Sequence, residues 1–473
     1  MTRYHVPVPL GLYLSVPFCR TKCSFCNFAS GVFSRPAFDQ YVRHIEAELG
    51  RSEQIAAEMG GHFDRQLDSI YLGGGTPSVL APDQLATLFR SVRKNFEVLP
   101  GAEITVEVAP GTLSPEILQT LIDAGVNRVS LGMQSFIDQE TRSVGRLHNR
   151  DITLRDIANL RSAGITEISL DLIAGLPHQT SESWTYSLAE TLATGVPHVS
   201  VYMLEVDEDS RLGSELIAGG TRYHAHYVPN DDAVADFYLQ ACDTLNSAGL
   251  HQYEISNFAR HREGNGFSRA VVNPEDNRRH PDRSRDATES RDPQFEWDSQ
   301  FEREGLDFSR AKNTTLDLCH PERSEGSLSS PQLPSHASRH NLKYWLRQPY
   351  LGFGVDAHSM LCAPRSGEPH AAVRFATSDN LDALLAGAPL TRTAVSEKNA
   401  IEELFFLGLR LNRGLDLTAV AEDYGIDAIE RYRQPITELT DSGLLTLDDG
   451  HLRLTPRGRL LSNDVFSAFL LPS

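Results

Sequence analysis

Residues 11–28 read Gly-Leu-Tyr-Leu-Ser-Val-Pro-Phe-Cys-Arg-Thr-Lys-Cys-Ser-Phe-Cys-Asn-Phe, which puts cysteines at Cys19, Cys23 and Cys26. A short apolar strand therefore leads directly into the spacing C-x₃-C-x₂-C. Three thiolates at this spacing can each hold one corner of a [4Fe–4S] cluster, which leaves the fourth iron without a cysteine ligand. An open position of this kind is typical of catalytic rather than structural metal sites, because it can bind a substrate or cofactor.

Zinc binding and burial as free thiols are the alternative interpretations of these cysteines. Zinc needs a fourth cysteine or histidine close by, and the nearest histidines, His5 and His44, lack finger-like spacing. The chain has only 6 cysteines, so the grouping of three of them between residues 19 and 26 favours an iron–sulfur site.

Length and charge limit the class of protein. A chain of 473 residues predicts more than one folded unit. It has 44 basic and 63 acidic residues, a net charge of −19, which argues against nucleic acid as a partner. The first residues contain no signal-peptide-like apolar run, and no stretch reaches the roughly 20 apolar residues of a spanning helix. We therefore expect a cytoplasmic protein without a transmembrane segment, which also suits an oxygen-labile cluster.

From residue 11 to about residue 255, short apolar strands alternate with amphipathic helical patterns. The predicted strands are Leu12–Val16, Ser69–Leu72, Ile104–Val108, Arg128–Leu131, Glu167–Leu172 and Val199–Leu204, and the predicted helices are residues 36–58, 82–97, 114–124, 151–163, 181–194 and 231–248. Six βα units in a row predict an α/β fold, an incomplete (β/α)6 TIM-like barrel with a parallel sheet, over residues 1–258. Active sites in such barrels lie at the carboxyl ends of the strands, where the cysteines stand.

The remainder of the chain divides into three segments. Residues 259–338 are polar, mixed in charge and without periodicity, and we predict a disordered insertion. A metal site at Cys319 and His320 is the alternative, but one such pair is too small a ligand set. Residues 339–390 are expected to complete the barrel, and residues 391–473 to form a small, mainly helical domain.

A winged-helix-like pattern fills the last segment. Helical patterns over Ala394–Leu411, Leu417–Tyr424 and Arg433–Asp441 precede a hairpin of Leu444–Leu447 and His451–Leu454. Such modules often bind DNA, but the acidity of this chain favours a packing or lid domain.

Candidate ligand-binding residues stand at the ends of the predicted strands. Gly73-Gly74-Gly75-Thr76 ends the second strand, and consecutive glycines let the backbone approach a ligand closely, with N–H groups free to meet a carboxylate. A tight βα turn is the alternative interpretation. Glu107 ends the third strand and can accept hydrogen bonds from ribose hydroxyls, or it is simply a solvated carboxylate.

Four further residues extend this set. Gln134 follows the fourth strand, and Arg146 can pair with a carboxylate. Asp171 is an ionisable residue inside an apolar strand, so it needs a partner, which a bound ligand or Arg146 can supply. Tyr13 precedes Cys19 in the first strand, and its hydroxyl can reach a ligand on the cluster unless it only packs in the core.

Together these motifs closely resemble the HemN/HemW branch of the radical S-adenosylmethionine (SAM) superfamily, over residues 8–258 and 339–470. That branch contains oxygen-independent coproporphyrinogen III dehydrogenases and haem chaperones. The resemblance implies that Cys19, Cys23 and Cys26 ligate a [4Fe–4S] cluster whose one non-cysteine-ligated iron chelates SAM. It also implies a SAM site lined by Tyr13, Phe25, Gly74, Gly75, Thr76, Glu107, Gln134, Arg146 and Asp171.

Two features separate the dehydrogenases from the haem chaperones within this branch. The dehydrogenases have a fourth cysteine two residues after the third, where this chain has Phe28. Residues 340–345 read His-Asn-Leu-Lys-Tyr-Trp and match the H-N-x-x-Y-W motif that the chaperones use for haem binding, which implies a haem site at His340, Asn341, Tyr344 and Trp345. A neutral imidazole is a good axial ligand of haem iron, and aromatic rings offer flat apolar surface to a porphyrin. A loop histidine beside core aromatics is the alternative.

One departure from the family concerns the insertion. In the family, the segment Glu254–Ala259 leads into the H-N-x-x-Y-W motif after a few residues, whereas here residues 259–338 intervene. Both flanks are intact, so we expect the insertion to be looped out.

The resemblance implies a haem chaperone without coproporphyrinogen oxidase activity. It would pass haem to recipient haemoproteins such as membrane respiratory enzymes, from the cytoplasm or the inner face of the membrane. A monomer or homodimer and a flavodoxin or ferredoxin as electron donor are expected. The rival is a coproporphyrinogen III dehydrogenase, which would use SAM for oxidative decarboxylation of propionates to vinyls. A radical SAM methyltransferase or other tailoring enzyme is the third alternative.

Overall fold

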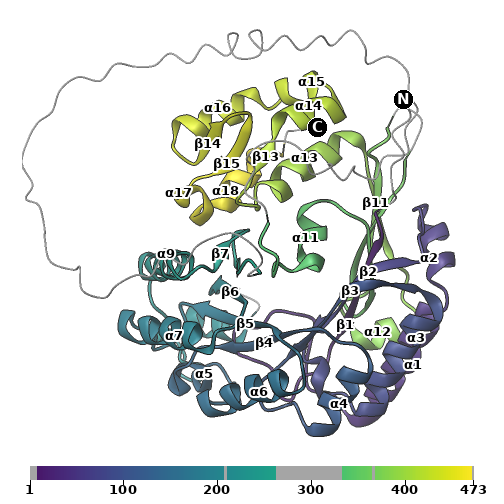
Figure 1. The fold of residues 1–473 in the computed structure, drawn as a ribbon, viewed down its shortest axis with the longest axis vertical. Helices are drawn as coiled ribbons and strands as arrows, with labels where there is room; N and C mark the ends of the chain where they lie inside the picture. The colour runs from purple at the N-terminus through teal and green to yellow at the C-terminus, as the bar shows by residue number, and fades with distance from the viewer. Residues whose placement is uncertain (1–7, 207–209, 263–332, 365–367, 471–473) are drawn as a thin grey trace, which may run out of the picture. The chain divides into compact units, whose positions relative to one another are not determined.

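A 12-stranded sheet organises most of the chain (Figure 1). The structure is a computed structural model that describes residues 8–206, 210–262, 333–364 and 368–470. The strands follow the order β12-β11-β10-β9-β1-β2-β3-β4-β5-β6-β8-β7. Their bounds are β1 Leu10–Val16, β2 Gln66–Gly74, β3 Glu97–Val108, β4 Arg128–Gln134, β5 Glu167–Ala174, β6 His198–Met203, β7 His251–Gln252, β8 Asn257–Ala259, β9 Tyr350–Gly354, β10 His358–Cys362, β11 Ala372–Ala376 and β12 Thr391–Val395.

Helices join successive strands of this sheet. They are α1 Arg35–Leu49, α2 Ser52–Met59, η1 Pro77–Val79, α3 Pro82–Asn95, α4 Pro115–Asp123, α5 Asp138–Ser143, α6 Arg150–Ser162, α7 Ser181–Thr194, α8 Arg211–Ala218, η2 Ala225–Tyr227, α9 Asp231–Ser247, α11 Arg339–Trp345 and α12 Leu381–Leu385. Several begin as the sequence signals indicated: the Ser114 side chain accepts from the Ile117 N–H at the start of α4.

The predicted incomplete barrel is confirmed. Strands β1 to β6 pair in parallel in their chain order, and β12 and β7 end the sheet without pairing to each other. Strand β9 adds a further parallel neighbour to β1, whereas β10, β11 and β12 continue antiparallel. The helix expected over residues 36–58 is two helices, because Gly50 ends α1 and glycine is a poor helix former.

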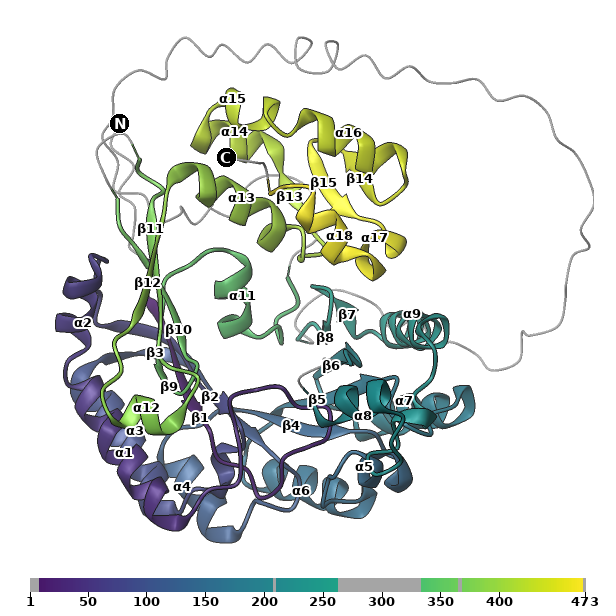
Figure 2. The same ribbon diagram turned by 180° about the vertical axis from the view of Figure 1, so that it is seen from behind.

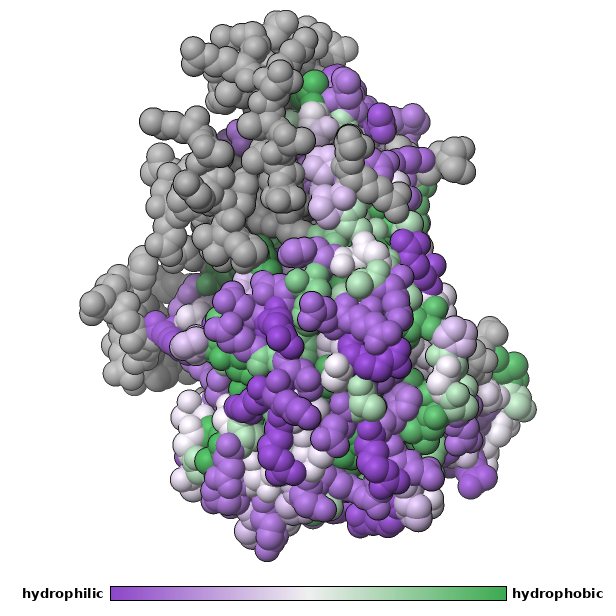
Figure 3. Space-filling model, turned by 90° about the vertical axis from the view of Figure 1, so that its right-hand side faces the viewer, coloured by the Kyte–Doolittle hydropathy of each residue, from purple (hydrophilic) through white to green (hydrophobic). Residues whose placement is uncertain are grey.

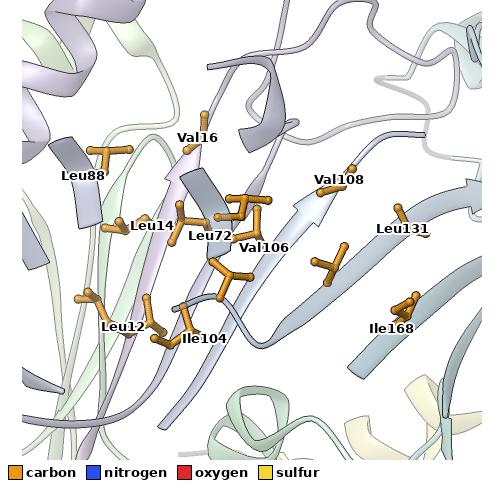
Figure 4. Packing of buried hydrophobic residues seen from close by; sticks show 14 of the residues in the cluster. Leu12, Leu14, Val16, Leu72, Leu88, Ile104, Val106, Val108, Leu131 and Ile168 are labelled. Carbon is orange, nitrogen blue, oxygen red and sulfur yellow. The ribbon is translucent and has the colours of Figure 1, made fainter. Parts of the chain in front are cut away.

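Alternation along the strands divides apolar from polar side chains. Leu12, Leu14 and Val16 of β1 face the covering helices and pack with residues such as Leu72, Val106 and Leu88 (Figure 4). The helices that cover this face turn hydrophilic side chains outward, and only separate hydrophobic spots interrupt them (Figure 3). Burial of this face against helices is what parallel sheets require.

The opposite, concave face of the sheet is polar. Register pairs Tyr13 with Tyr71, Glu107 with Ser130, and Asp171 with Ser200, so side chains from six neighbouring strands share this face. Figures 1 and 2 show helices α1, α3, α4 and α6 outside the curved sheet and α11 inside it. Helix α11 therefore lies against the face that holds most predicted SAM-site residues.

The insertion leaves and rejoins the sheet at one place. The His336 N–H donates to the Arg260 carbonyl over 3.3 Å, and the Arg262 N–H donates to the Ser335 hydroxyl. Residues 263–332, most of the predicted disordered insertion, lie outside the described residues, as do Cys319 and His320, whereas the ends of that prediction are ordered: Ala259 belongs to β8 and Ser338 caps α11. After the insertion the chain does not add a strand beside β8, because the next strand, β9, pairs with β1.

The last part of the chain combines helices with a 3-stranded sheet of order β13-β15-β14. Its elements are α13 Glu397–Gly408, β13 Leu415–Asp416, α14 Leu417–Tyr424, α15 Ile426–Glu430, α16 Arg433–Asp441, β14 Leu445–Asp448, β15 His451–Leu454, α17 Pro456–Leu460 and α18 Ser462–Ser467. The predicted winged-helix-like order of helices and hairpin is confirmed. Throughout the described residues, no helix is both long and apolar enough to cross a membrane.

Candidate functional site

The three cysteines lie on one loop after β1, which backbone hydrogen bonds fold back on itself. The Cys19 N–H donates to Gly31 O over 2.8 Å, and the Cys26 N–H donates to Cys23 O over 3.3 Å. Beyond the loop, the Ser24 N–H donates to Val144 O over 3.1 Å. The Leu212 N–H at the start of α8 donates to Ser24 O over 2.9 Å, and in Figure 2 the purple segment after β1 reaches across to α8.

The thiols are close enough to influence one another. All three are free, and burial raises the pKa of both Cys19 and Cys23. The charge of Cys26 raises both pKa values further, whereas Arg146 lowers them. Burial therefore disfavours the thiolate forms that a metal needs, and among the described residues no three His, Cys, Asp or Glu side chains lie close enough together to hold one metal ion. The Thr76 hydroxyl lies 3.8 Å from Cys19 Sγ, to which it donates.

The glycine turn after β2 packs tightly against the start of the cysteine loop. Gly74 has φ +99°, and a Cβ on Gly75 would lie 2.8 Å from Phe18 O and 2.9 Å from Val16 O. The Gly75 N–H donates to Val16 O, and the Gly74 N–H donates to Glu107 Oε2 over 3.1 Å. The expectation that these N–H groups are free for a ligand is therefore wrong, because the protein itself uses them.

Glu107 lies at the centre of the concave face. Tyr71 donates to its Oε1 over 2.8 Å. Burial raises the pKa of Glu107 to about 7, the nearby Asp171 raises it further, and the hydrogen bond from Tyr71 acts in the opposite direction. A carboxyl group with this pKa can be an acceptor for ribose hydroxyls or a proton donor near neutral pH.

Asp171 finds its partner in Ser130, which donates to its two oxygens over 3.0 and 2.9 Å. Burial raises the pKa of Asp171, and hydrogen bonds from Ser200 and Ser130 and the charge of Arg146 counteract it. The protein itself thus supplies a partner for Asp171. Arg146, the other expected partner, acts on Asp171 only through its charge.

Gln134 and Arg146 meet above Gly132. A Cβ on Gly132 would lie 3.3 Å from Gln134 Nε2 and 3.4 Å from Arg146 Nη2. Gln134 has φ 65°, a strained conformation for a non-glycine residue. Among the described residues, Gln134 Oε1 and Arg146 Nε are buried without a hydrogen-bond partner. Such atoms are costly unless a polar ligand satisfies them, so this end of the sheet fits a polar ligand such as SAM.

Phe25 and Tyr13 flank this region differently. Phe25 packs at the mouth of the barrel against Val144, Ile173 and Leu176. The Tyr13 ring lies 6.0 Å from Tyr71, and burial raises the pKa of its hydroxyl, so it faces the interior of the concave surface. The predicted SAM residues therefore gather around the carboxyl ends of β1 to β5.

Sequence reasoning missed Tyr71, Ser130 and Tyr202. Each lies on the concave face: Tyr71 donates to Glu107, Ser130 donates to Asp171, and burial, followed by the charge of Asp171, raises the pKa of Tyr202. The period of two along each strand, counted back from Gly73 or from Gly132, would have found Tyr71 and Ser130.

His340, the predicted haem ligand, is enclosed. It is 1% exposed, its Nδ1 lies 3.0 Å from Ser69 Oγ, and its Nε2 lies 2.8 Å from the Tyr344 hydroxyl. Its ring stacks on Tyr71 with 5.2 Å between centroids. Burial lowers the pKa of His340 to about 3, so the imidazole is neutral. Ligation of iron by this residue would require one of these two hydrogen bonds to break.

The same arrangement recurs at His198 in β6. There Nδ1 lies 2.7 Å from Ser169 Oγ, and Nε2 lies 2.9 Å from the Tyr253 hydroxyl. A serine–histidine–tyrosine contact on the concave face is therefore also a structural device of this sheet, and His198 provides a matched reference for His340.

The other haem-motif residues do not share one surface with His340. The Asn341 N–H donates to the N-cap Ser338. The Trp345 ring lies under the Arg410 guanidinium, 4.3 Å from its centroid, and its indole Nε1 is buried without a hydrogen-bond partner among the described residues. His340 and Tyr344 contact each other, whereas Trp345 faces the last part of the chain.

Comparison with known families and proteins agrees with this arrangement. The radical SAM superfamily matches residues 13–189, and the HemN C-terminal domain matches residues 395–461. A protein of Lactococcus lactis named heme chaperone HemW is 27% identical over 467 residues, 98% of each chain. The Bacillus subtilis protein of that name is 28% identical and covers 97% of this chain and 98% of its own length. The Escherichia coli protein of that name is 33% identical over 253 residues, 53% of this chain and 63% of its own.

The solved structure of the Escherichia coli coproporphyrinogen III oxidase HemN, a radical SAM enzyme, matches with a TM-score of 0.68. It covers 98% of this chain and 90% of its own, at 22% identity, so this likeness is one of fold. The superfamily match spans Tyr13 to Asp171, which includes all predicted cluster and SAM residues. Residues 13–189 therefore match the radical SAM superfamily, and the chain as a whole is similar to the branch that contains HemN and HemW.

Proposed function

We propose that this protein is a haem chaperone, which binds haem and transfers it to haem-requiring proteins. Several relatives that match the chain over nearly its whole length are named heme chaperone HemW, which supports this assignment. Phe28 stands where the dehydrogenases have a fourth cysteine, so this position supplies no thiol. Its side chain is 64% exposed.

The observation that carries the proposal is the position of α11 on the concave side of the sheet. His340 of α11 stacks on Tyr71, and Tyr71 donates to Glu107, whose other oxygen accepts from Gly74. The haem motif and the SAM site thus share one continuous set of contacts. A ligand at either end changes the same hydrogen bonds, which is the physical requirement for cluster and SAM to control haem release.

The match to the radical SAM superfamily implies SAM and a [4Fe–4S] cluster. We propose that Cys19, Cys23 and Cys26 hold the cluster with one iron open to SAM, which would supply a redox-active or regulatory centre. Around it, Glu107 and Asp171 offer acceptors to ribose or ammonium groups, and Arg146 and Gln134 offer the unpartnered polar atoms. Thr76 donates to Cys19 and holds its sulfur in place.

Other parts of the assignment rest on the family alone. A flavodoxin or ferredoxin as electron donor, membrane respiratory enzymes as recipients, and association with the inner face of the membrane stay predictions. The state as monomer or homodimer is also a prediction.

The test is an anaerobic haem titration of the cluster-reconstituted protein, followed by absorbance. We expect saturable binding near one haem per chain, and at least about tenfold weaker binding in His340→Ala, because loss of an axial ligand removes the iron–nitrogen bond. His198→Ala is the matched control, since it removes an equally buried histidine with the same kinds of partner.

Two results would contradict the proposal. Binding that His340→Ala and His198→Ala weaken equally would mean that His340 supports the fold rather than the iron. Formation of protoporphyrinogen IX from coproporphyrinogen III by the reconstituted protein would replace the chaperone with the dehydrogenase.

A further inference from the structure

Three histidines and a tyrosine gather on two loops beside the mouth of the barrel. His178 follows β5, and His224, His226 and Tyr227 belong to the segment around η2. His178 Nε2 lies 3.4 Å from His224 Nδ1, and the rings of His178 and His226 each lie 4.0 Å from the Tyr227 ring centroid. We call these four residues the histidine cluster.

The backbone holds the histidine cluster in a set geometry. His178 and His224 have φ 70° and 62°, a conformation that costs free energy in non-glycine residues and that often marks functional sites. The His178 N–H donates to Tyr227 O, and the Tyr227 N–H donates to His224 O. The local fold thus fixes the imidazoles relative to one another.

A buried carboxylate anchors the same segment to α8. Glu215 of α8 accepts from the Tyr223 N–H over 2.8 and 2.7 Å, and from the Ala225 N–H over 3.2 Å. Leu212 at the start of α8 is bonded to the cysteine loop at Ser24, so α8 connects the histidine cluster to the cysteine loop.

We propose that the histidine cluster is a second haem-binding site, at which incoming haem iron is first ligated by an imidazole at the protein surface. This inference rests on the proposed chaperone function and adds a site outside the H-N-x-x-Y-W motif. Its ligand is an iron porphyrin with anionic propionates, and the bond formed is a coordinate bond from a neutral imidazole nitrogen to iron, with no change of oxidation state.

Accessibility distinguishes the histidine cluster from His340. His340 is 1% exposed with both nitrogens engaged, so haem cannot meet it unless one of these hydrogen bonds breaks and the side chain becomes exposed. His178 and His224 are half-buried and His226 is exposed. Burial and the neighbouring imidazoles lower the pKa of His178, which favours the neutral form that binds iron.

The surroundings also suit the rest of a haem molecule. Tyr227 is 50% exposed and offers a ring face. Helix α8, which Glu215 bonds to the same segment, carries Leu216 and Ile217 with exposed fractions of 50% and 68%. Arg222 follows α8 on the same segment, with its guanidinium 5.3 Å from the Tyr223 ring centroid. A guanidinium is the side chain that best pairs with a carboxylate such as a propionate.

The test compares haem association in stopped-flow experiments on the full-length, cluster-reconstituted protein. The variant is His178→Asn with His224→Asn, because asparagine tolerates the left-handed backbone and removes only the imidazoles. The matched control is His251→Asn with His261→Asn, a second histidine pair whose ring centroids lie 5.2 Å apart, as they do in the pair under test. Cluster iron content and the melting temperature verify that both variants fold.

We expect the fast phase of the absorbance change to slow at least tenfold in the His178/His224 variant and to stay unchanged in the control pair. His340→Ala should keep this fast phase and lose only the later, tight binding. Rates equal to those of the wild type in the His178/His224 variant would overturn the inference.

Further arms separate this inference from the proposed function. If the tight binding depends on His340 while the His178/His224 variant behaves as wild type, the chaperone proposal stands and the second site falls. If the His178/His224 variant loses the fast phase but tight binding does not depend on His340, the second site stands and the assignment of His340 falls. If metal-free protoporphyrin IX competes as well as haem, the site stacks on the porphyrin without ligating iron, and the imidazole site is overturned. The imidazole site is also overturned if the histidine cluster binds Ni²⁺ but not haem.

Discussion

Tyr71 joins the two predicted ligand sites, because its ring stacks on the imidazole of His340 with 5.2 Å between centroids and 27° between planes. Its hydroxyl points to the other site and donates to Glu107 over 2.8 Å. The residues in contact are far apart in the chain: His340 also lies within hydrogen-bond distance of Ser69 of the same strand, 271 positions earlier. A side chain with one partner in each site is the natural place to test whether the sites communicate.

Tyr71→Phe should shift the pH dependence of SAM binding upward. The hydrogen bond from Tyr71 lowers the pKa of Glu107, which burial holds at about 7, so its removal disfavours the ionised acceptor. We expect the midpoint of SAM affinity against pH to rise by roughly one unit, about 1.4 kcal/mol. Isothermal titration at several pH values measures this. Tyr41→Phe, which loses a buried hydrogen bond to Ser15 O, should leave the midpoint in place.

Glu107→Gln should stabilise the ligand-free protein at alkaline pH. The folded-state pKa of Glu107 is raised from 4.5 to about 7, so the folded state binds more protons than the unfolded state between these values. Its contribution to stability is therefore present below pH 4.5 and lost as pH rises towards 7. The melting temperature of the variant minus that of the wild type should rise across this window, by an amount worth about 3 kcal/mol. A difference that does not change with pH would contradict the assignment.

Tyr344→Phe should speed the tight binding of haem. The hydroxyl of Tyr344 competes with iron for His340 Nε2, and loss of a hydrogen bond worth about 1 kcal/mol corresponds to roughly fivefold faster access. Stopped-flow absorbance of the slow phase measures the rate. Tyr253→Phe frees Nε2 of His198 but also the Ser338 N–H at the start of α11, so Tyr41→Phe, which loses a buried hydrogen bond to Ser15 O, is the control and should have no effect. Slower binding after Tyr344→Phe would mean that iron does not use this nitrogen.

Cys19→Ala, Cys23→Ala and Cys26→Ala should each abolish the cluster. With three cysteine ligands there is no spare thiolate, so bound iron and sulfide should fall below about a tenth of the wild-type content. Iron analysis and visible absorbance after anaerobic reconstitution provide the measurement. Cys242→Ala removes a buried free thiol from α9 and should retain the cluster. Full cluster content in any of the first three variants would remove that residue from the ligand set.

Replacement of residues 263–332 by a short glycine–serine linker should preserve the fold. The described flanks meet where His336 bonds to Arg260, so a few residues can close the gap. A shorter loop costs less closure entropy, and stability should stay equal or increase by about 2 kcal/mol. The melting temperature, cluster iron and haem binding of the shortened protein test this. Loss of haem binding alone, with the fold intact, would assign the insertion a role in haem access.

Local patterns predicted the parts of the site that a single segment builds. The cysteine spacing, Gly74 with its positive φ, and the alternation along β1 to β6 depend on neighbours a few residues away, so their structural consequences follow from the chain itself. The short helices α5 and α8 were not predicted because six to eight residues carry little periodicity. Helices α1 and α2 were merged because their apolar pattern continues past Gly50.

The sequence by itself determined the parallel βα order, the cysteine loop and the resemblance to the family, because backbone geometry and residue spacing are encoded over short distances. Only the tertiary structure decided that His340 is enclosed between Ser69, Tyr71 and Tyr344, that His198 repeats the arrangement, and that His178 meets His224. Those facts depend on packing between distant segments, whose desolvation and hydrogen bonds decide which imidazole is accessible. A motif names the residues, but burial determines which nitrogen can reach a ligand.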